Sequence, residues 1–239
     1  MFENKVVLIT GVSRETGLGY ETAKRLKELG LTVIITAREL EAVTALGKQL
    51  DVDAAQLDVT SQESIEKLLD VITKQYGKLD ILINNAGGFF DQNSDLLTVD
   101  VNFMKEALDL NLFGALRMIQ AFVPLLKLAD NGTIVNVTSG IGSFSDPVFG
   151  LANYFADVPA FATSKLALNG LTVKLAKRLK KDKIRINAVC PGFVATTPGM
   201  EAYGARPVTE GANGIVWAAT LPEDGPTGGF FRDGEVIGW

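Results

Sequence analysis

Residues 6–38 read VVLITGVSRETGLGYETAKRLKELGLTVIITAR, and this stretch decides the fold. The apolar, mostly β-branched run at 6–9 is typical of a buried strand. A glycine-containing loop follows, and residues 20–29 then place apolar side chains three apart along one helix face. Gly30 stands where a helix needs a left-handed residue, and 31–36 is a second apolar strand. The stretch therefore predicts a βαβ unit with glycines at its first strand-to-helix turn.

The loop between the first strand and the helix has the composition of a phosphate-binding loop. Glycine lets the backbone turn tightly, and it lets a phosphate approach the amides at a helix N-terminus, where the dipole favours anions. Three glycines and two hydroxyl residues exceed what a plain turn requires. We expect the dinucleotide-binding loop to contain Thr10, Gly11, Ser13, Arg14, Gly17, Leu18 and Gly19. A tight turn without a ligand is the alternative.

The end of the second strand indicates which dinucleotide is bound. NAD sites usually place Asp or Glu about 20 residues after the glycines, on the ribose 2′-hydroxyl. Here that place holds Thr36-Ala37-Arg38, with no acid before Glu39. A carboxylate would repel a 2′-phosphate, whereas a guanidinium would bind it. Arg14 and Arg38 therefore predict NADP(H) in preference to NAD(H), unless either arginine is only a solvated surface residue.

Composition narrows the classes of protein and of site. A net charge of −5 and a pI of about 4.9 argue against nucleic-acid binding. The single cysteine, Cys190, excludes an internal disulfide and fits a reducing cytoplasm. The chain has no histidine, which excludes Ser-His-Asp catalysis and most zinc sites, so we expect no metal. We see no signal peptide and no apolar run long enough to cross a bilayer, and we therefore expect a cytoplasmic protein without a membrane partner.

Strands and helices alternate along the whole chain. The pattern predicts one α/β domain over residues 1–239, with a Rossmann-type, doubly wound, mostly parallel seven-stranded sheet and helices on both faces. The expected strands are 6–9, 31–36, 54–57, 79–83, 133–137, 184–189 and 228–231. The expected helices are 20–29, 39–50, 61–76, 101–128, 160–181 and 207–221. The loops at about 140–159 and 194–206 are expected to form a flap and a substrate lid.

Polar or glycine-rich residues follow nearly every predicted strand. In an open α/β sheet, ligands bind outside the carboxyl ends of the strands. These ends carry the glycine loop, Arg38, Asp58, Asn84 to Gly87, Thr138 and Ser139, and Pro191-Gly192. Loops are polar in general, but a purely structural sheet has no need of this pattern.

At these positions the chain resembles the short-chain dehydrogenase/reductase family over its whole length. The shared motifs are Thr10-Gly11 with Gly17-x-Gly19, Leu57-Asp58-Val59, Asn84-Asn85-Ala86-Gly87, Asn111 in Leu-Asn-Leu-Phe-Gly, Asn136-Val137-Thr138-Ser139, Lys165 in Ala-Thr-Ser-Lys, and Pro191-Gly192-Phe193-Val194-Ala195-Thr196. The end of the chain resembles the carbonyl-reductase branch, with Glu210-Gly211-Ala212, Leu221-Pro222, a Gly-Gly-Phe-Phe strand and a terminal Trp.

The resemblance implies hydride transfer between a nicotinamide nucleotide and a carbonyl or alcohol. It would place Ser139 on the substrate oxygen, Lys165 on the nicotinamide ribose, and Asn111 on a water of the proton relay. The cofactor positions that it implies are Leu57, Asp58 and Val59 near the adenine, Asn85, Ala86 and Gly87 on the adenosine side, and Pro191, Gly192, Val194 and Thr196 near the nicotinamide. In the family, the helices at 101–128 and 160–181 commonly form subunit interfaces. We therefore expect a homodimer or homotetramer, with a monomer as the alternative.

Two features depart from the family pattern. The glycine loop is two residues longer than usual, and Glu15 and Thr16 are the expected insertion. Phe161 stands four residues before Lys165, where the family has its catalytic tyrosine, and residues i and i+4 share one helix face. Phenylalanine has no proton to give to the developing alkoxide. General acid catalysis typically contributes about 10²- to 10⁴-fold, so we expect ligand binding to persist and turnover to be slow.

Three explanations for Phe161 stay open. In the first, it is an engineered replacement of a tyrosine in an ordinary reductase. In the second, it is a natural variant that uses another proton source, such as water through Ser139, or that acts on an unusual substrate. In the third, the chain is a catalytically silent, cofactor-binding regulator or scaffold. Tyr154 is out of register with Lys165 and is not expected to substitute. Six phenylalanines near the site predict a pocket for an apolar carbonyl or alcohol: Phe89, Phe90, Phe144, Phe149, Phe155 and Phe193.

Overall fold

A computed structural model describes residues 4–88, 95–153 and 158–239. The described strands form a single sheet in the order β3-β2-β1-β4-β5-β6-β7-β8. They are β1 (Val6–Ile9), β2 (Thr32–Ala37), β3 (Asp53–Gln56), β4 (Ile81–Asn84), β5 (Thr133–Val137), β6 (Arg185–Val189), β7 (Phe230–Arg232) and β8 (Glu235–Val236). Strands β1 to β7 pair in parallel, as the sequence predicted. The sequence missed β8, a two-residue strand antiparallel to β7.

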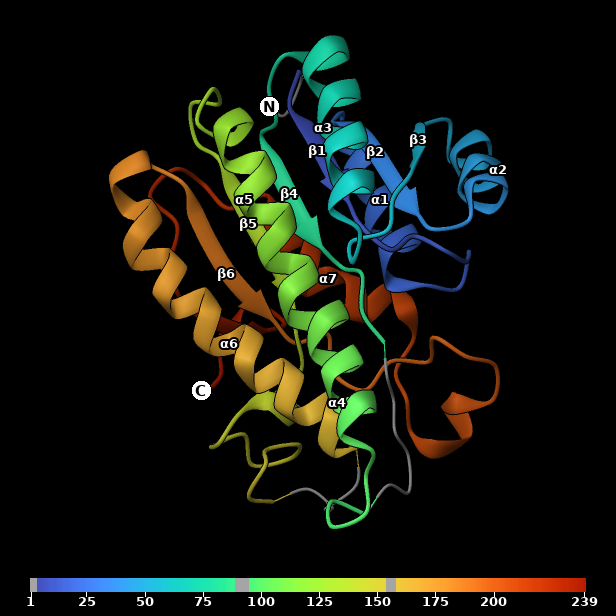
Figure 1. The fold of residues 1–239 in the computed structure, drawn as a ribbon, viewed down its shortest axis with the longest axis vertical. Coiled ribbons are helices and arrows are strands. Elements are labelled where there is room, and N and C mark those ends of the chain that lie inside the picture. The colour runs from blue at the N-terminus through green and yellow to red at the C-terminus, as the bar shows by residue number, and fades with distance from the viewer. Residues whose placement is uncertain (1–3, 89–94, 154–157) are drawn as a thin grey trace.

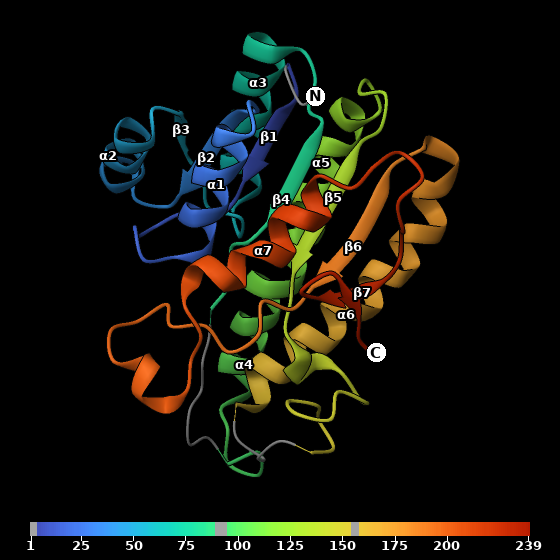
Figure 2. The same ribbon diagram turned by 180° about the vertical axis from the view of Figure 1, so that it is seen from behind.

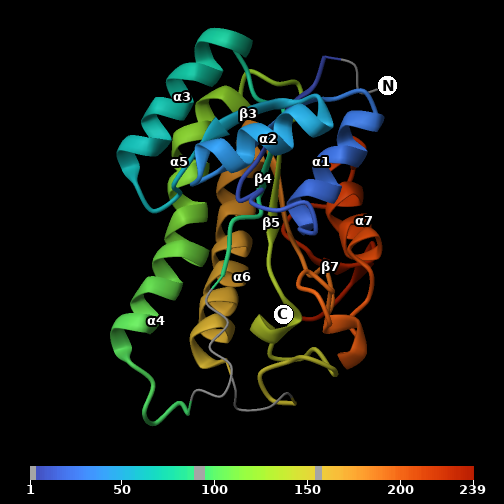
Figure 3. The same ribbon diagram turned by 90° about the vertical axis from the view of Figure 1, so that its right-hand side faces the viewer.

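Helices cover both faces of the sheet (Figure 1). They are α1 (Leu18–Glu28), α2 (Leu40–Leu50), α3 (Gln62–Tyr76), α4 (Val101–Leu108), α5 (Gly114–Leu126), α6 (Pro159–Leu179) and α7 (Val208–Ala219). Figure 3 shows the layers edge-on, with α3, α5 and α6 on one side and α1 and α7 on the other. The architecture is therefore the expected doubly wound α/β fold.

Side chains that alternate along the strands divide the core into two clusters. In β1, Val6 and Leu8 belong to the cluster under α3, α5 and α6. Val7 and Ile9 belong to the cluster under α1, α2 and α7. Successive strand residues point to opposite faces, so a strand buried on both faces must be apolar throughout. This is why the run at 6–9 has no polar residue.

The long helix predicted at 101–128 is present as a continuous helical stretch over Val101–Leu126, but it is not a regular α-helix throughout. It consists of α4, a π-helical turn at Asp109–Phe113, and α5. A π turn takes one more residue per hydrogen-bonded ring than an α turn, and such turns occur frequently at functional sites. The predicted Asn111 lies inside it.

The same helical stretch, Val101–Leu126, is long and apolar enough to cross a bilayer by length and composition. The expectation that no apolar segment has this length was therefore wrong. Its side chains at Met118, Phe122 and Leu126 are buried against the sheet. A core helix passes the same test, so the finding is weak evidence for a membrane span.

The sheet has one topological switch point, between β1 and β4. From β1 the chain moves outward to β2 and β3, and then returns to β4 on the other side of β1. The loops after β1 and β4 therefore diverge to opposite faces and leave a crevice at the carboxyl ends of these strands. Figure 2 shows α1 and α7 on the face that is hidden in Figure 1.

We predict that Phe122→Ala destabilises the chain by about 3–5 kcal/mol, because Phe122 is fully buried and the truncation leaves a cavity. Leu128→Ala, just beyond the same helix, is the control, because Leu128 is 65% exposed. Urea unfolding followed by circular dichroism measures both variants. Equal losses in the two would contradict this description of the core.

Candidate active site

Backbone from β1 and β4 meets at the switch point through Thr10 and Asn85. The Thr10 hydroxyl accepts hydrogen bonds from the amides of Asn85 (3.1 Å) and Ala86 (3.0 Å). The Asn85 side-chain amide donates to the carbonyls of Thr10 (2.7 Å) and Gly11 (3.2 Å). Thr10 is buried, and these bonds occupy both side chains. Thr10 and Asn85 thus fix the two loops to each other.

The glycines of the loop are required by space. Gly11 has φ +74°, and a Cβ there would lie 2.5 Å from the Cα of Ala86. A Cβ on Gly19 would lie 2.6 Å from the Asn85 side-chain nitrogen. Gly17 caps α1 without a side-chain hydrogen bond, so the first amides of the helix are not capped by a side chain. The result is a bare backbone cradle of the kind that binds phosphate.

The two arginines predicted at the cofactor lie in different surroundings. Arg14 lines the cleft. Arg38 is exposed after β2, with its carbonyl accepting a hydrogen bond from Gln56, and it lies outside the cleft lining. Glu15, in the loop extension, accepts a hydrogen bond from Gln49 of α2 (2.9 Å). The extension is therefore tied to α2 and does not fold over the cradle.

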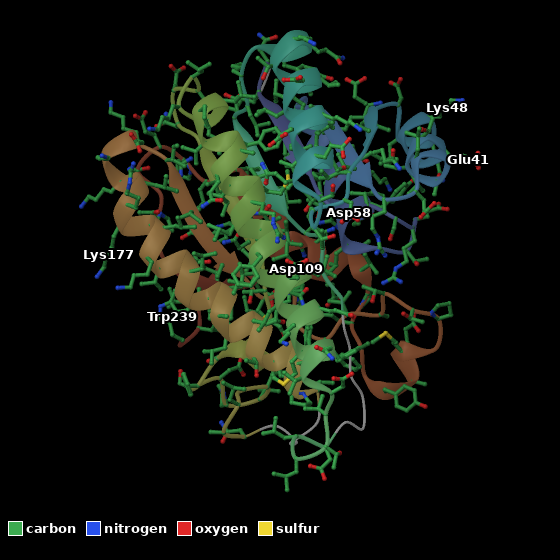
Figure 4. All side chains as sticks on the ribbon, in the orientation of Figure 1. Glu41, Lys48, Asp58, Asp109, Lys177 and Trp239 are labelled. Carbon is green, nitrogen blue, oxygen red and sulfur yellow. The ribbon has the colours of Figure 1, made fainter. Side chains whose placement is uncertain are left out.

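Several predicted cofactor residues do not line the cleft. Leu57 and Val59 are buried in the core, and Val59 packs where a Cβ on Gly114 would clash. Asp58 accepts hydrogen bonds from the amide and hydroxyl of Thr60. Figure 4 shows Asp58 on the α2 side of the molecule, well away from Trp239. The cleft lining includes none of these residues, nor Thr10, Ala86 or Asn111.

Asn111 fastens the π-helical turn to the loop after β4. Its side-chain oxygen accepts from the Gly88 amide (3.0 Å), and its nitrogen donates to the Gly88 carbonyl (2.9 Å) and to Ser164 (3.0 Å). The residue is 1% exposed. With this geometry Asn111 positions neighbouring groups, and the water role implied by the family resemblance stays a prediction.

Lys165 is a buried cation at the floor of the cleft. Its Nζ donates to the Val137 carbonyl (3.0 Å) and lies 5.5 Å from the centre of the Phe161 ring. A Cβ on Gly87 would lie 3.3 Å from this nitrogen, which is a tight contact. Burial lowers the pKa of Lys165 to about 8, and the neighbouring Cys190 opposes that shift.

Ser139 and Phe161 complete the predicted catalytic group, and both line the cleft with Lys165. The Ser139 hydroxyl accepts from the Ile141 amide (3.3 Å), and within the described residues its own O–H donates to no protein group. Phe161 is 8% exposed and packs with Ile141 and Val158. Val158 has φ +55°, which is strained for a β-branched residue. The structure thus gathers a hydroxyl, an ammonium and a phenyl ring at this point.

The predicted lid is a closed loop. Val194 and Arg206 form a bridge at its base, and the Arg206 guanidinium donates to the Pro191 carbonyl and to Asp233. Its tip is a short 3₁₀ helix, Met200–Tyr203, where Tyr203 is 83% exposed. Gly192, with φ +76°, lies against Arg206.

The cleft has a volume of about 530 Å³ and brings together most of the predicted residues. Those that line it are Gly11, Ser13, Arg14, Gly17, Leu18, Gly19, Asn85, Gly87, Ser139, Phe161, Lys165, Pro191, Gly192, Val194 and Thr196. The site prediction did not include Val12, Tyr20, Gly88, Val137, Ile141, Val158, Cys190 and Met200, which also line it. Most are apolar and could not be told from core residues by pattern. Phe149 and Phe193 line it as expected, whereas Phe144 does not; Phe89, Phe90, Tyr154 and Phe155 lie outside the described residues.

Comparison with known proteins agrees with this geometry. The family model described as short chain dehydrogenase matches residues 5–206. The chain is 32% identical to (+)-neomenthol dehydrogenase of Arabidopsis thaliana over 294 aligned positions, covering 97% of each protein. A short chain dehydrogenase from Mycobacterium smegmatis superposes with a TM-score of 0.82 at 26% identity, over 97% of this chain and 92% of that one. A metagenomic short-chain oxidoreductase solved in complex with NADP gives 0.76 at 25% identity, over 94% of each chain.

The pKa of Lys165 predicts a pH dependence of stability. The folded pKa is about 8 and the ordinary value is 10.5, so between these pH values the unfolded chain binds more protons. The free energy of unfolding should therefore rise with pH, relative to Lys165→Met, by about 1.4 kcal/mol per pH unit within this window. Urea unfolding at a series of pH values measures it, with Lys177→Met on the exposed side of α6 as the control. Parallel curves for the parent and Lys165→Met would contradict the assignment.

Proposed function

The chain belongs to the short-chain dehydrogenase family, and we propose that it is an NADP(H)-dependent reductase of apolar ketones or aldehydes whose turnover is slowed by Phe161. The family membership makes it an oxidoreductase that acts on alcohol or carbonyl groups of a small molecule with NAD(P). One observation carries the proposal: Ser139, Lys165 and the glycine cradle line a single cleft.

The cradle fits a dinucleotide. At three glycines of the loop, a side chain would clash with neighbouring atoms or crowd Arg14. The start of α1 has no side-chain cap, so its amides can donate to a phosphate. When bound, the nicotinamide group would supply or accept the hydride. Preference for the phosphorylated form is supported by Arg14 at the cleft and by Arg38, with no acid, at the end of β2. The solved relative in complex with NADP is consistent with it.

Ser139 and Lys165 have chemistry suited to a carbonyl substrate. The Ser139 hydroxyl, free to donate, would hold the substrate oxygen and stabilise the negative charge that develops there. The Lys165 ammonium, fixed on the Val137 carbonyl, keeps a positive charge beside the same place. Because Phe161 offers only a ring, neither the ring nor its backbone can give the alkoxide a proton, and water must reach it instead. The expected result is tight binding with slow turnover.

Part of the cleft lining is apolar and suits an apolar substrate. This part consists of Ile141, Phe149, Val158, Phe193 and Met200, and we call it the substrate end of the cleft. Among the residues described there, none of the lining side chains is a carboxylate, so a cationic substrate would find no partner. A second candidate function, a cofactor-binding regulator or scaffold, is favoured by one observation, the absence of a hydroxyl on Phe161.

Phe161→Tyr separates these two functions. We expect it to raise the rate of NADPH oxidation with ketones by about 10²- to 10⁴-fold, because it restores a general acid beside Lys165. The dissociation constant for NADPH should change little. Phe144→Tyr is the control, since Phe144 is 64% exposed and does not line the cleft. No turnover in Phe161→Tyr, with NADPH still bound, would favour the regulator.

Cofactor preference is tested by binding alone. We expect Arg38→Ala and Arg14→Ala to weaken NADPH binding by about 10- to 100-fold, the loss of one charge-assisted hydrogen bond. NADH binding should stay nearly unchanged, because it has no 2′-phosphate. Isothermal titration calorimetry measures both, with the exposed Arg178→Ala as the control. An equal loss for the two nucleotides would contradict the proposed preference.

A further inference from the structure

The flap is fastened to the last residues of the chain. We call residues 140–153 the described flap and residues 230–239 the tail. Ser143 donates to the Gly238 carbonyl (2.7 Å), and Ser145 donates to the Trp239 carbonyl (3.1 Å). A Cβ on Gly238 would lie 2.0 Å from the Ser145 hydroxyl oxygen, so the contact is close. Both ribbon views show the end of the chain beside this loop (Figures 1 and 2).

Stacking holds the tail itself in place. The ring of Trp239 stacks on Phe230 with centroids 5.3 Å apart, and Phe230 is 1% exposed on β7. The Ile237 amide donates back to the Phe230 carbonyl (2.9 Å). The tail therefore presents a fixed surface to the flap.

Asp146 is the centre of the flap contact. Its side chain is fully buried and is paired with Arg232 of β7. One carboxylate oxygen accepts from the amides of Val148 (2.9 Å) and Phe149 (3.0 Å). Burial alone would raise the pKa of Asp146, but these amides and Arg232 hold it below its usual range. A buried charge with these partners fixes the backbone that carries Phe149.

Arg232 also contacts two residues of the cleft lining. Its guanidinium carbon lies 5.2 Å from the centre of the Phe149 ring, within the range of a cation–π contact. It also donates to the sulfur of Cys190 (3.4 Å), which accepts from the Gly140 amide (3.1 Å). Phe149 and Cys190 both line the cleft.

We propose that Asp146 and Arg232 are positioning residues that hold Phe149 as a wall of the substrate end of the cleft, and that this pair thereby sets the size of substrate accepted. The inference rests on the proposed reductase function. Asp146 holds the backbone of Phe149 and Arg232 contacts its ring, so loss of the pair removes contacts that position this wall and leaves the residues of the cofactor cradle unchanged.

A contact that only stabilises the fold would behave differently. It would lower the free energy of unfolding and would leave the relative affinity for large and small ketones unchanged. The ratio of two affinities is therefore the informative readout, because a general loss of folded protein cancels in it.

The test uses the double variant Asp146→Ala/Arg232→Met, which removes the ion pair together with the oxygen that accepts from the Val148 and Phe149 amides, and which leaves no buried charge unpaired. Dissociation constants for cyclohexanone and its tert-butyl derivative are measured by calorimetry in the presence of NADP⁺, which cannot reduce a ketone. We expect the affinity ratio to shift about tenfold toward the larger ketone. The control is Arg178→Met/Asp182→Asn, an ion pair with its arginine exposed on α6, for which the ratio should not move.

Phe149→Ala and the triple variant identify the route of the effect. If the pair acts through Phe149, Phe149→Ala should shift the affinity ratio in the same direction as the double variant. The triple variant, which combines Phe149→Ala with the double variant, should then shift the ratio little further. Phe149→Ala also keeps the test decisive if the double variant fails to fold. Hydrogen exchange should become faster at the amides of Val148 and Phe149 in the double variant.

The outcomes are distinct. Ketone binding by the parent with an unchanged ratio in the double variant or in Phe149→Ala would overturn this inference alone. Fully additive shifts would overturn the route through Phe149. Failure of the parent to bind either ketone, with or without NADP⁺, would overturn the reductase function and this inference together.

Discussion

The structure depends on one close approach, between the backbone after β1 and the backbone after β4. Gly11 lies against Ala86 with no room for a Cβ, and the Thr10 hydroxyl bonds two amides of the neighbouring loop. This contact exists because the strand order reverses between β1 and β4, so that the two loops leave the same edge in opposite directions. The glycine cradle, the uncapped helix start and Lys165 all take their places relative to this contact.

Charge in the cleft is unevenly distributed. Lys165 is a buried cation that contacts a carbonyl and an aromatic face, and Arg14 is a second cation in the cleft lining. The described carboxylates that form ion pairs, such as Asp146 with Arg232, lie outside the cleft lining. An anionic, phosphorylated cofactor would therefore meet a site of complementary charge, while a neutral substrate end is left to the phenylalanines.

The pattern of apolar residues and glycines along the sequence predicted the strands and the end of the first helix. Runs of apolar residues placed the seven parallel strands, and Gly30 has the left-handed φ of +87° that its position after a helix implied. The π turn around Asn111 escaped prediction, because an apolar helix with one extra residue in a turn has nearly the same periodicity as one without. The tail contacts also escaped it, since Ser143 and Gly238 are 95 residues apart and neither is marked by its neighbours. Clefts lined by ordinary apolar residues, such as Val12 or Met200, carry no signal that separates them from core.

The position of the tail matters for how the molecule is handled. The first described residues lead into the amino end of β1, whereas the cleft lies at the carboxyl ends of the strands. The C-terminal end of the described chain lies beside the flap (Figure 1). A purification tag joined after Trp239 would emerge next to Ser145 and would compete with the stacking of Trp239 on Phe230. A tag at the other end of the chain would project from the far side of the molecule and leave the flap undisturbed.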